Sequence, residues 1–455
     1  MILITYNPAN GMLLQEYSPF TLKNIDRALT VADEQFSQWK NLSLSLRCDY
    51  MLALQSLLKS QELEIAALMT EEMGKPLTQS IAEVKKCSLL CQYQVDHIES
   101  WLKPEVVQTE FHYSAVHYEP LGVLLAIMPW NFPLWQVFRF AVSQVLAGNV
   151  VLLKHAPNVT GCAVKIASLF EEAGFPKGVF TTLVVDVDQV EAIIHDGRVK
   201  GVALTGSAAA GRIVGAQAGS ALKKVSLELG GSDPCVILSD ADVELAAEIS
   251  VAARMLNAGQ ICIAPKRCIV VGYIYDQWLR CVLDKIQQYR CADPLDATTN
   301  LGPLAREDLR QHVHEQIQSS VAAGAELLCG GKIPDGDGFF YPPTVLTGVL
   351  PGMAAFDEEL FGPVVSIVRA ETEEEAFQLA SQTIYGLGAV ICTSDKERGR
   401  QLALSHLEAG SCYVNAPVAS DPRFPIGGIK ASGVGCELSE DGLKEFMQAK
   451  VVCVK

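Results

Sequence analysis

The chain of 455 residues is too long to fold around one hydrophobic core, so two or three domains are expected. Its 52 acidic and 36 basic side chains give a formal net charge of -16, which disfavours nucleic acids and anionic membranes as partners. The 14 cysteines include no CxxC pair, and neither a cationic leader nor a membrane-length apolar run is visible, so a cytoplasmic protein with reduced thiols is expected.

The first hundred residues predict helices, because apolar side chains recur at spacings of three and four residues. These helices are expected over 25–39, 48–73 and 80–101. From Gly122 the pattern changes to short β-branched runs that alternate with helices. The expected strands are 122–128, 150–154, 179–185 and 199–205, and the helices between them are 134–147, 160–173 and 188–195. Repeated strand–helix–strand units predict a parallel, doubly wound sheet that binds ligands beyond the carboxyl ends of its strands.

A second α/β series begins near Lys224 and predicts another domain of similar size. Its expected strands are 225–229, 235–238, 268–271, 364–368, 388–392 and 411–415, with helices over 243–256 and 275–289. Residues 106–118 alternate like a hairpin, and 449–455 form a terminal strand that lacks a neighbour of its own. An unpaired terminal strand is an aggregation liability, so we expect these two segments to pair with each other or across subunits.

Cys262 follows a helical run that Gly259 interrupts, and a thiol on such a turn projects into a cleft more readily than into a core. The thiolate is the reactive form of cysteine, and a free thiol titrates near about 8.5, so a catalytic site must favour ionisation. Taken alone, this segment is equally compatible with a buried structural cysteine.

Two further segments suggest acid–base and oxyanion chemistry. Glu228 ends a strand before Gly230 and Gly231, where a carboxylate could activate water, although a solvated loop carboxylate is the simpler interpretation. Asn131 lies within the stiff turn Pro129-Trp130-Asn131-Phe132-Pro133, which would direct its amide toward an oxyanion. The alternative for this turn is a purely structural role at the start of a helix.

The segment from Thr205 to Gly211 joins a strand to a helix, the place where backbone amides and the helix dipole bind phosphate. It is not a GxGxxG fingerprint, so by itself it is weak evidence for a nucleotide. No cluster with the spacing of metal ligands is present in the sequence, and no metal is expected.

Together these segments resemble the aldehyde dehydrogenase superfamily over essentially the whole chain. PWNFP, TGS, LELGGSDP, GQIC, EELFGPV and PIGGIKASGVG occur in the order that the family shows. The resemblance implies a fold of two doubly wound α/β domains plus a small β oligomerisation element. It implies a cofactor domain of 1–101 and 121–224, a catalytic domain of 225–430, and an oligomerisation element of 102–120 and 446–455.

The resemblance also implies the roles of residues. Cys262 is the implied nucleophile, Asn131 the oxyanion donor and Glu228 the general base in oxidation of an aldehyde to an acid through a thiohemiacetal and a thioester. NAD or NADP is the implied hydride acceptor, with contacts from Trp130, Lys154, Pro157, Gly206, Ser207, Glu359 and Phe361. Pro157 replaces a glutamate found in many NAD-preferring members, so both cofactors stay open. A homo-oligomer, either dimer or tetramer, is expected.

Within the family, the sequence around Lys154 and Ser420 is most similar to bacterial succinate-semialdehyde dehydrogenases. Arg139 and Ser420 match residues that bind the distal carboxylate of that substrate, and a lone arginine in an apolar helix is costly without a partner. Leu256 replaces a second arginine found in some relatives, which leaves a broad-specificity aliphatic or aromatic aldehyde dehydrogenase as the alternative. A non-catalytic, crystallin-like relative is the third possibility.

Overall fold

The apolar runs of the first half form a six-stranded sheet in the computed structural model, which describes residues 2–455. Its order is β17-β9-β8-β5-β6-β7, and only the edge strand β17 is antiparallel. Every residue of β6 is buried, because helices cover both faces of a parallel sheet. The strands are β5 (Val123–Met128), β6 (Val150–His155), β7 (Phe180–Thr182), β8 (Val199–Thr205), β9 (Lys224–Glu228) and β17 (Gly433–Val434).

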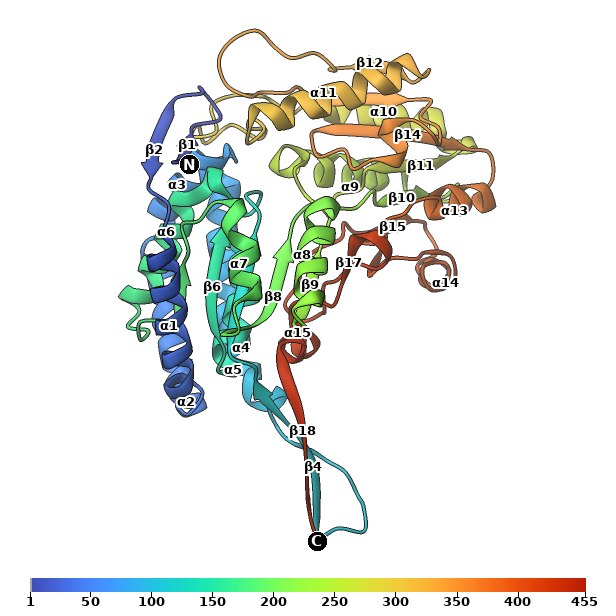
Figure 1. Ribbon diagram of the computed structural model, residues 1–455. Coiled ribbons are helices and arrows are strands. Elements are labelled where there is room, and N and C mark those ends of the chain that lie inside the picture. Colours follow the sequence, from blue (N-terminus) through green and yellow to red (C-terminus); the bar gives the residue numbers. More distant parts are fainter. Residues whose placement is uncertain (1) are drawn as a thin grey trace.

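The helices of this half surround the sheet (Figure 1). They are α1 (Leu22–Trp39), α2 (Leu44–Ser60), α3 (Glu62–Met73), α4 (Leu77–Trp101), α5 (Trp135–Ala147), α6 (Thr160–Glu172), α7 (Val190–His195) and α8 (Ala208–Ser220). Helix α5 packs on β5 and β6, and α4 packs on α5, so α4 lies one layer outside the sheet. All residues of α5 are buried, and Arg139 is its single charged residue.

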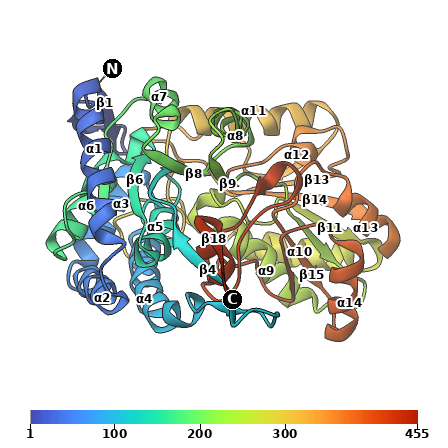
Figure 2. The ribbon, with the colours of Figure 1, turned by 60° about the horizontal axis from the view of Figure 1, so that its bottom comes forward.

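The second half forms a seven-stranded sheet of order β12-β13-β14-β11-β10-β15-β16, with only β12 antiparallel. Its strands are β10 (Pro234–Ile237), β11 (Arg267–Val271), β12 (Glu326–Cys329), β13 (Thr344–Thr347), β14 (Val364–Ala370), β15 (Gly388–Cys392) and β16 (Ser411–Val414). Its helices are α9 (Val243–Met255), α10 (Tyr275–Ile286), α11 (Glu307–Ala322), α12 (Ala354–Asp357), α13 (Glu373–Ser381) and α14 (Lys396–His406). Each sheet has its own apolar core, which accounts for two bodies side by side in Figure 2.

A three-stranded antiparallel element leaves the body of the molecule, with the C-terminus at its tip (Figure 1). It consists of β3 (Glu105–Val106), β4 (Tyr113–Pro120) and β18 (Met447–Val454), and α15 (Ser439–Glu445) leads into β18. Strand β18 pairs with β4 along its whole length, from Met447 opposite Pro120 to Val454 opposite Tyr113. The expectation that the two segments pair with each other is thereby confirmed within one chain.

Two elements differ from the sequence prediction. The single helix expected over 48–73 is two helices, α2 and α3, that meet at Gln61. The strand expected at 225–229 was assigned to the second series, but β9 pairs with β8 and so belongs to the first sheet. Apolar periodicity shows that a segment is a helix or a strand, whereas it carries no information about a one-residue break or about which strand lies alongside.

The remaining regular structure is short. It comprises the hairpin of β1 (Leu3–Tyr6) and β2 (Leu13–Tyr17), and the 3-10 turns η1 (Pro157–Val159), η2 (Val187–Gln189), η3 (Leu256–Gly259), η4 (Gly272–Ile274) and η5 (Lys430–Ser432). Within residues 2–455, no helix is both long enough and apolar enough to cross a membrane.

Candidate active site

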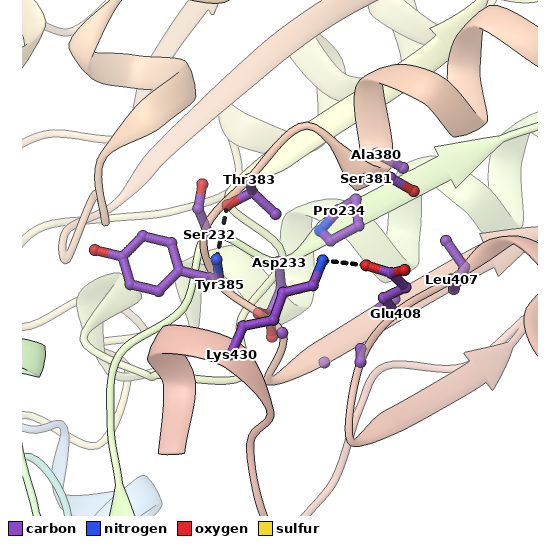
Figure 3. A pocket seen from close by; sticks show the side chains of 14 residues that line it. Ser232, Asp233, Pro234, Ala380, Ser381, Thr383, Tyr385, Leu407, Glu408 and Lys430 are labelled. Carbon is purple, nitrogen blue, oxygen red and sulfur yellow. Dashed lines mark hydrogen bonds and ion pairs between the residues drawn. The ribbon is translucent and has the colours of Figure 1, made fainter. Parts of the chain in front are cut away.

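A cavity of about 580 Å³ opens between the two halves of the molecule, and Cys262 lies in its wall. Its walls come from the start of α4, from α5, from the end of α9 and from the loop 417–420. A second hollow, lined by Asp233, Tyr385 and Lys430, measures about 10 Å³ (Figure 3). That volume holds at most one water molecule, so only the first cavity of these two can admit a substrate.

The backbone before Cys262 forms a left-handed turn. Helix α9 ends at Met255, and Asn257, Ala258 and Gly259 have φ values of 52°, 51° and 74°. Nδ2 of Asn257 donates a 2.8 Å hydrogen bond to the carbonyl oxygen of Asn131. A β-carbon on Gly259 would lie 2.0 Å from the carbonyl oxygen of Gly362. The break in the helix that the sequence placed at Gly259 therefore begins earlier, and two distant loops hold the turn in place.

The Cys262 side chain lines the cavity and is half-buried, and partial removal from water raises the pKa of its thiol to about 11. The cations Lys266 and Arg139 oppose this rise, while the carboxylates Glu359 and Glu228 add to it. The thiol is therefore protonated at neutral pH, and a base must accept its proton before the sulfur can attack a carbonyl carbon.

Lys266 is fully buried beneath the nucleophile loop, and the sequence analysis did not identify it. Its Nζ donates to the carbonyl oxygens of Ile261, at 3.0 Å, and of Cys262, and lies 3.6 Å from Oε1 of Glu359. It thus fixes the loop and adds positive charge near the thiol. The signal in the sequence is a charged pair, Lys266-Arg267, at the start of the buried strand β11.

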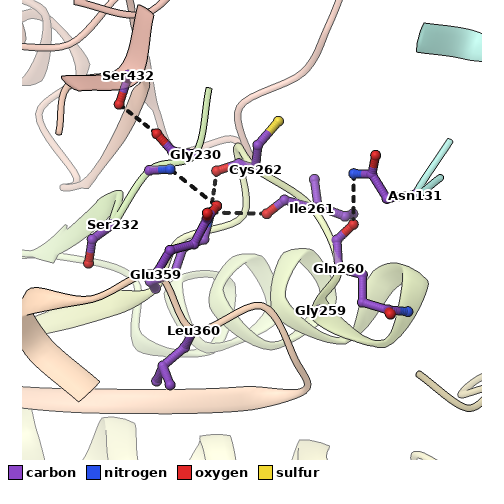
Figure 4. A network of polar contacts seen from close by, with 12 residues as sticks. Asn131, Gly230, Ser232, Gly259, Gln260, Ile261, Cys262, Glu359, Leu360 and Ser432 are labelled. Atoms are coloured by element: carbon purple, nitrogen blue, oxygen red, sulfur yellow. Dashed lines mark hydrogen bonds and ion pairs between the residues drawn. The ribbon is translucent and has the colours of Figure 1, made fainter. Parts of the chain in front are cut away.

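Asn131 is buried across the loop from Cys262. Its Nδ2 donates to the Gln260 carbonyl oxygen at 3.0 Å, which leaves the second N–H of the amide for an oxyanion (Figure 4). The turn that carries Asn131 is well supported. Nε2 of His155 lies 2.8 Å from the Pro133 carbonyl oxygen, and Oε1 of Glu83 accepts from the backbone N–H groups of Leu134 and Trp135.

Glu228 ends β9 in a buried position, and burial together with the nearby Glu437 raises its pKa. A buried carboxyl of raised pKa is suited to moving protons near neutral pH. Nη2 of Arg139 lies 3.8 Å from Oε2 of Glu228, and Nε of Arg139 forms an ion pair with Glu437. The three side chains are at most 3% exposed, so one guanidinium lies between two buried carboxylates.

Glu437 is the second residue that the sequence analysis missed. It follows β17, the strand that returns to pair with β9, and this return brings Glu437 to the far side of Arg139. A buried arginine requires a partner, so Arg139 in its apolar helix implied a carboxylate. No local pattern indicates which of the 52 acidic residues is that partner.

The residues predicted to bind the cofactor lie beyond the carboxyl ends of neighbouring strands. Trp130 follows β5, Lys154 and Pro157 lie at the end of β6, and Gly206 and Ser207 follow β8. Ser207 caps α8 by accepting from the Ala210 N–H, and space around Gly206 is open. A helix N-terminus and the buried ammonium of Lys154 fit a nucleotide, which supplies negative charge.

Two more predicted residues, Glu359 and Phe361, come from the second half and lie next to the carboxyl edge of the six-stranded sheet. The Phe361 and Trp130 rings contact each other edge to face, with centroids 5.7 Å apart. Oε1 of Glu359 accepts a 3.1 Å hydrogen bond from the Gly231 N–H, and a β-carbon on Gly230 would clash with this carboxylate. Close approach of Glu359 therefore explains why glycines follow Glu228.

The predicted substrate residues Arg139 and Ser420 both line the cavity. Oγ of Ser420 accepts a 3.2 Å hydrogen bond from Nε1 of Trp135, so its own proton can be donated to a ligand. Leu256, Ile263 and Val418 make the rest of this wall apolar. Among residues 2–455, no group of three side chains has the arrangement of a metal site.

The chain is similar to known proteins over its full length. The model of the aldehyde dehydrogenase family matches residues 3–452. The succinate semialdehyde dehydrogenase [NAD(P)+] of Escherichia coli is 45% identical over 449 residues, which cover 99% of this chain and 97% of that protein. A probable succinate-semialdehyde dehydrogenase [NADP(+)] of Synechocystis is 42% identical over 454 residues and all of both chains.

A solved structure supports the same conclusion. The succinic semialdehyde dehydrogenase of Streptococcus pyogenes, in complex with NADP+, has a TM-score of 0.97 at 33% identity and covers 99% of each chain. This similarity confirms the fold class expected from the sequence. The matching family model, the similar relatives and the shared fold agree that this chain belongs to the aldehyde dehydrogenase family.

Proposed function

We propose that this protein oxidises succinate semialdehyde to succinate with NAD or NADP as the hydride acceptor. The observation that carries the proposal is the composition of one cavity wall, in which the Cys262 thiol is accompanied by the Arg139 guanidinium and the Ser420 hydroxyl. A substrate that places its aldehyde carbon at the Cys262 thiol and a carboxylate at Arg139 and Ser420 is an ω-carboxylated aldehyde. The names of the two relatives above favour the same substrate.

The chain's own residues supply the acid–base steps. Glu228 takes the proton of Cys262, and the sulfur adds to the aldehyde carbon to give a thiohemiacetal oxyanion. The remaining Asn131 N–H and the Cys262 backbone N–H stabilise this oxyanion, and one such donor contributes about 100- to 1000-fold in rate. The bound cofactor supplies the acceptor for the hydride, which leaves an acyl thioester on Cys262. Glu228 releases the Cys262 proton to solvent and then removes a proton from water. Hydrolysis of the thioester releases the acid, and Glu228 returns the proton taken from water to the sulfur, which restores the thiol.

In this scheme the six-stranded half, which comprises 2–101, 121–228 and the returning strand β17, holds the cofactor through Lys154 and the start of α8. The half that begins after β9 and extends to 430 supplies the nucleophile, and 102–120 with 446–455 assemble subunits into a dimer or tetramer. Pro157 offers no carboxylate to bind a ribose hydroxyl or to repel a 2′-phosphate, which supports use of either cofactor. The acidic charge and the thiol-rich composition support a cytoplasmic location.

A direct assay tests the substrate. Formation of reduced NAD and NADP is followed by absorbance with succinate semialdehyde and with butanal, an uncharged aldehyde of equal length. We expect kcat/KM to be at least about tenfold higher for the charged aldehyde, because a desolvated, charge-assisted hydrogen bond contributes about 1.5–3 kcal/mol. Cys262→Ala, which removes the nucleophile, should abolish turnover of both.

Equal kcat/KM values for the two aldehydes would reject the substrate assignment and retain the chemistry. One observation favours that second candidate, a broad-specificity aldehyde dehydrogenase: the wall formed by Leu256, Ile263 and Val418 is apolar and matches an aliphatic chain. Turnover that survives in Cys262→Ala would instead overturn the assignment of the nucleophile.

A further inference from the structure

Helix α4 brings a second cation to the cavity, and neither the motifs nor the scheme above uses it. Lys86 lines the cavity wall, and its Nζ lies 3.9 Å from the centroid of the Trp135 ring. Among residues 2–455, no carboxylate forms an ion pair with Lys86. The indole face instead holds the ammonium by a cation–π contact, a weaker interaction than a buried ion pair.

The carboxylates closest to Lys86 are already neutralised by other cations. Glu83 forms a buried ion pair with Lys75. Oδ1 of Asp421 accepts a 2.9 Å hydrogen bond from Nε of Arg423, and its other oxygen pairs with the same guanidinium. Within residues 2–455, Lys86 is therefore left without an ion-pair partner of its own at the cavity.

Arg139, the other cation of this wall, is in the opposite situation. It forms an ion pair with Glu437 and lies 3.8 Å from Glu228. An anionic ligand that approached Arg139 alone would therefore meet a cation whose charge the buried carboxylate of Glu437 already compensates. The whole protein also repels anions, since its net charge is -16.

We propose that Lys86 is a specificity-determining residue, which binds the distal carboxylate of the aldehyde substrate. The inference rests on the proposed function and deepens it. Trp135 links the two halves of this subsite, because its ring face contacts Lys86 while its Nε1 donates to Oγ of Ser420. A carboxylate placed there forms an ion pair with the ammonium of Lys86 and accepts a hydrogen bond from the hydroxyl of Ser420.

The protonation of Lys86 gives the proposal a pH dependence. Burial, with a smaller contribution from the nearby Arg139, lowers the pKa of Lys86 to about 8, while Cys87, Glu83 and Asp421 act in the opposite direction. In the free enzyme, Lys86 is therefore charged below about pH 8 and neutral above it. Preference for a charged aldehyde should accordingly decline as the pH rises through this value.

The test compares kcat/KM for succinate semialdehyde and butanal in three variants. Lys86→Met removes the charge and keeps an apolar stem, so the ratio of the two values should fall about 10- to 100-fold. Lys86→Arg keeps the charge and should retain most of the ratio, with the decline above pH 8 abolished. Lys85→Met is the matched control, because Lys85 is 61% exposed and lies near Glu62, outside the cavity; neither value should change.

The outcomes separate the two proposals. If the wild type prefers succinate semialdehyde and Lys86→Met keeps the same ratio, the assignment of Lys86 is wrong and the proposed function stands. If the wild type shows no preference, both fail.

A measurement on the wild type avoids any effect of substitution on folding. The protein is treated with acetic anhydride at pH 7 with and without succinate, and acetylation of each lysine is quantified by peptide mass spectrometry. Succinate should protect Lys86 and leave Lys85 unaffected. Equal acetylation of Lys86 in both samples, at succinate concentrations that inhibit turnover, would overturn the assignment.

Discussion

At the scale of single residues, Cys262 and Glu228 lie in surroundings that disfavour their ionised forms. The thiol of Cys262 and the carboxyl of Glu228 both have raised pKa values, because the folded protein surrounds them and carboxylates lie nearby. Each is consequently protonated more often than it would be in water, so transfer of the thiol proton to Glu228 requires the ionised form of Glu228, whose share increases with pH. Lys266 and Arg139 partly offset the cost of ionising the thiol.

The raised pKa of Cys262 can be measured in the free enzyme. With a pKa of about 11, the thiolate fraction rises about tenfold per pH unit, so the rate of Cys262 alkylation by iodoacetamide should do the same between pH 7 and 10. A small free thiol serves as the control and should level off near about pH 9. Mass spectrometry of the Cys262 peptide gives the rate, and a plateau below pH 9 would contradict the assignment.

At the scale of elements, the loop before Cys262 forms a left-handed turn that contacts with two distant segments hold in place. Three successive residues, Asn257 to Gly259, have positive φ, and the turn is buried against the Asn131 and Gly362 backbones. Left-handed conformations at non-glycine residues cost about 1–3 kcal/mol and persist only where surrounding contacts enforce them. The turn therefore stores strain next to the reacting sulfur.

Gly259→Ala should disrupt this element. The added β-carbon would meet the Gly362 carbonyl at 2.0 Å and would face a φ of +74°, so we expect a loss of about 1–3 kcal/mol in unfolding free energy and a large loss of turnover. Urea denaturation and the aldehyde assay measure the two effects. The control is Gly219→Ala in α8, where the added carbon meets open space and stability should be unchanged or slightly higher. Equal behaviour of the two variants would remove the argument for strain.

At the scale of the whole molecule, the proposals assign different functions to three parts, which are the two sheet-based halves and the β3–β4–β18 element. The cavity lies where the two sheet-based halves meet, so the thiol and the cofactor-binding edge come from different cores. The β3–β4–β18 element extends away from both, and several of its apolar side chains are exposed, including Val451 at 70% and Val106 at 64%. Exposed apolar strands of this kind are suited to contact with another subunit.

Val451→Glu tests that role of the element. A charge on this surface should shift the protein to a smaller species in sedimentation velocity, while circular dichroism stays unchanged, because Val451 makes few contacts within its own chain. Lys450→Glu, one residue earlier on the same strand, is a charge-changing control that should leave the oligomer in place. An unchanged sedimentation coefficient for Val451→Glu would argue against assembly through this surface.

Much of this protein could be predicted from the sequence, because the relevant signals are local. Alternating strands and helices indicated the sheets, and compact motifs such as GQIC and PWNFP carried the family resemblance and the roles proposed for Cys262, Glu228 and Asn131. Glu437 as the partner of Arg139, Lys266 beneath the nucleophile, Lys86 on Trp135 and β9 in the first sheet were decided only by the tertiary structure. The physical reason is sequence separation: Arg139 and Glu437 meet because β17 returns to β9, and a pairing between distant segments leaves no periodic pattern along the chain.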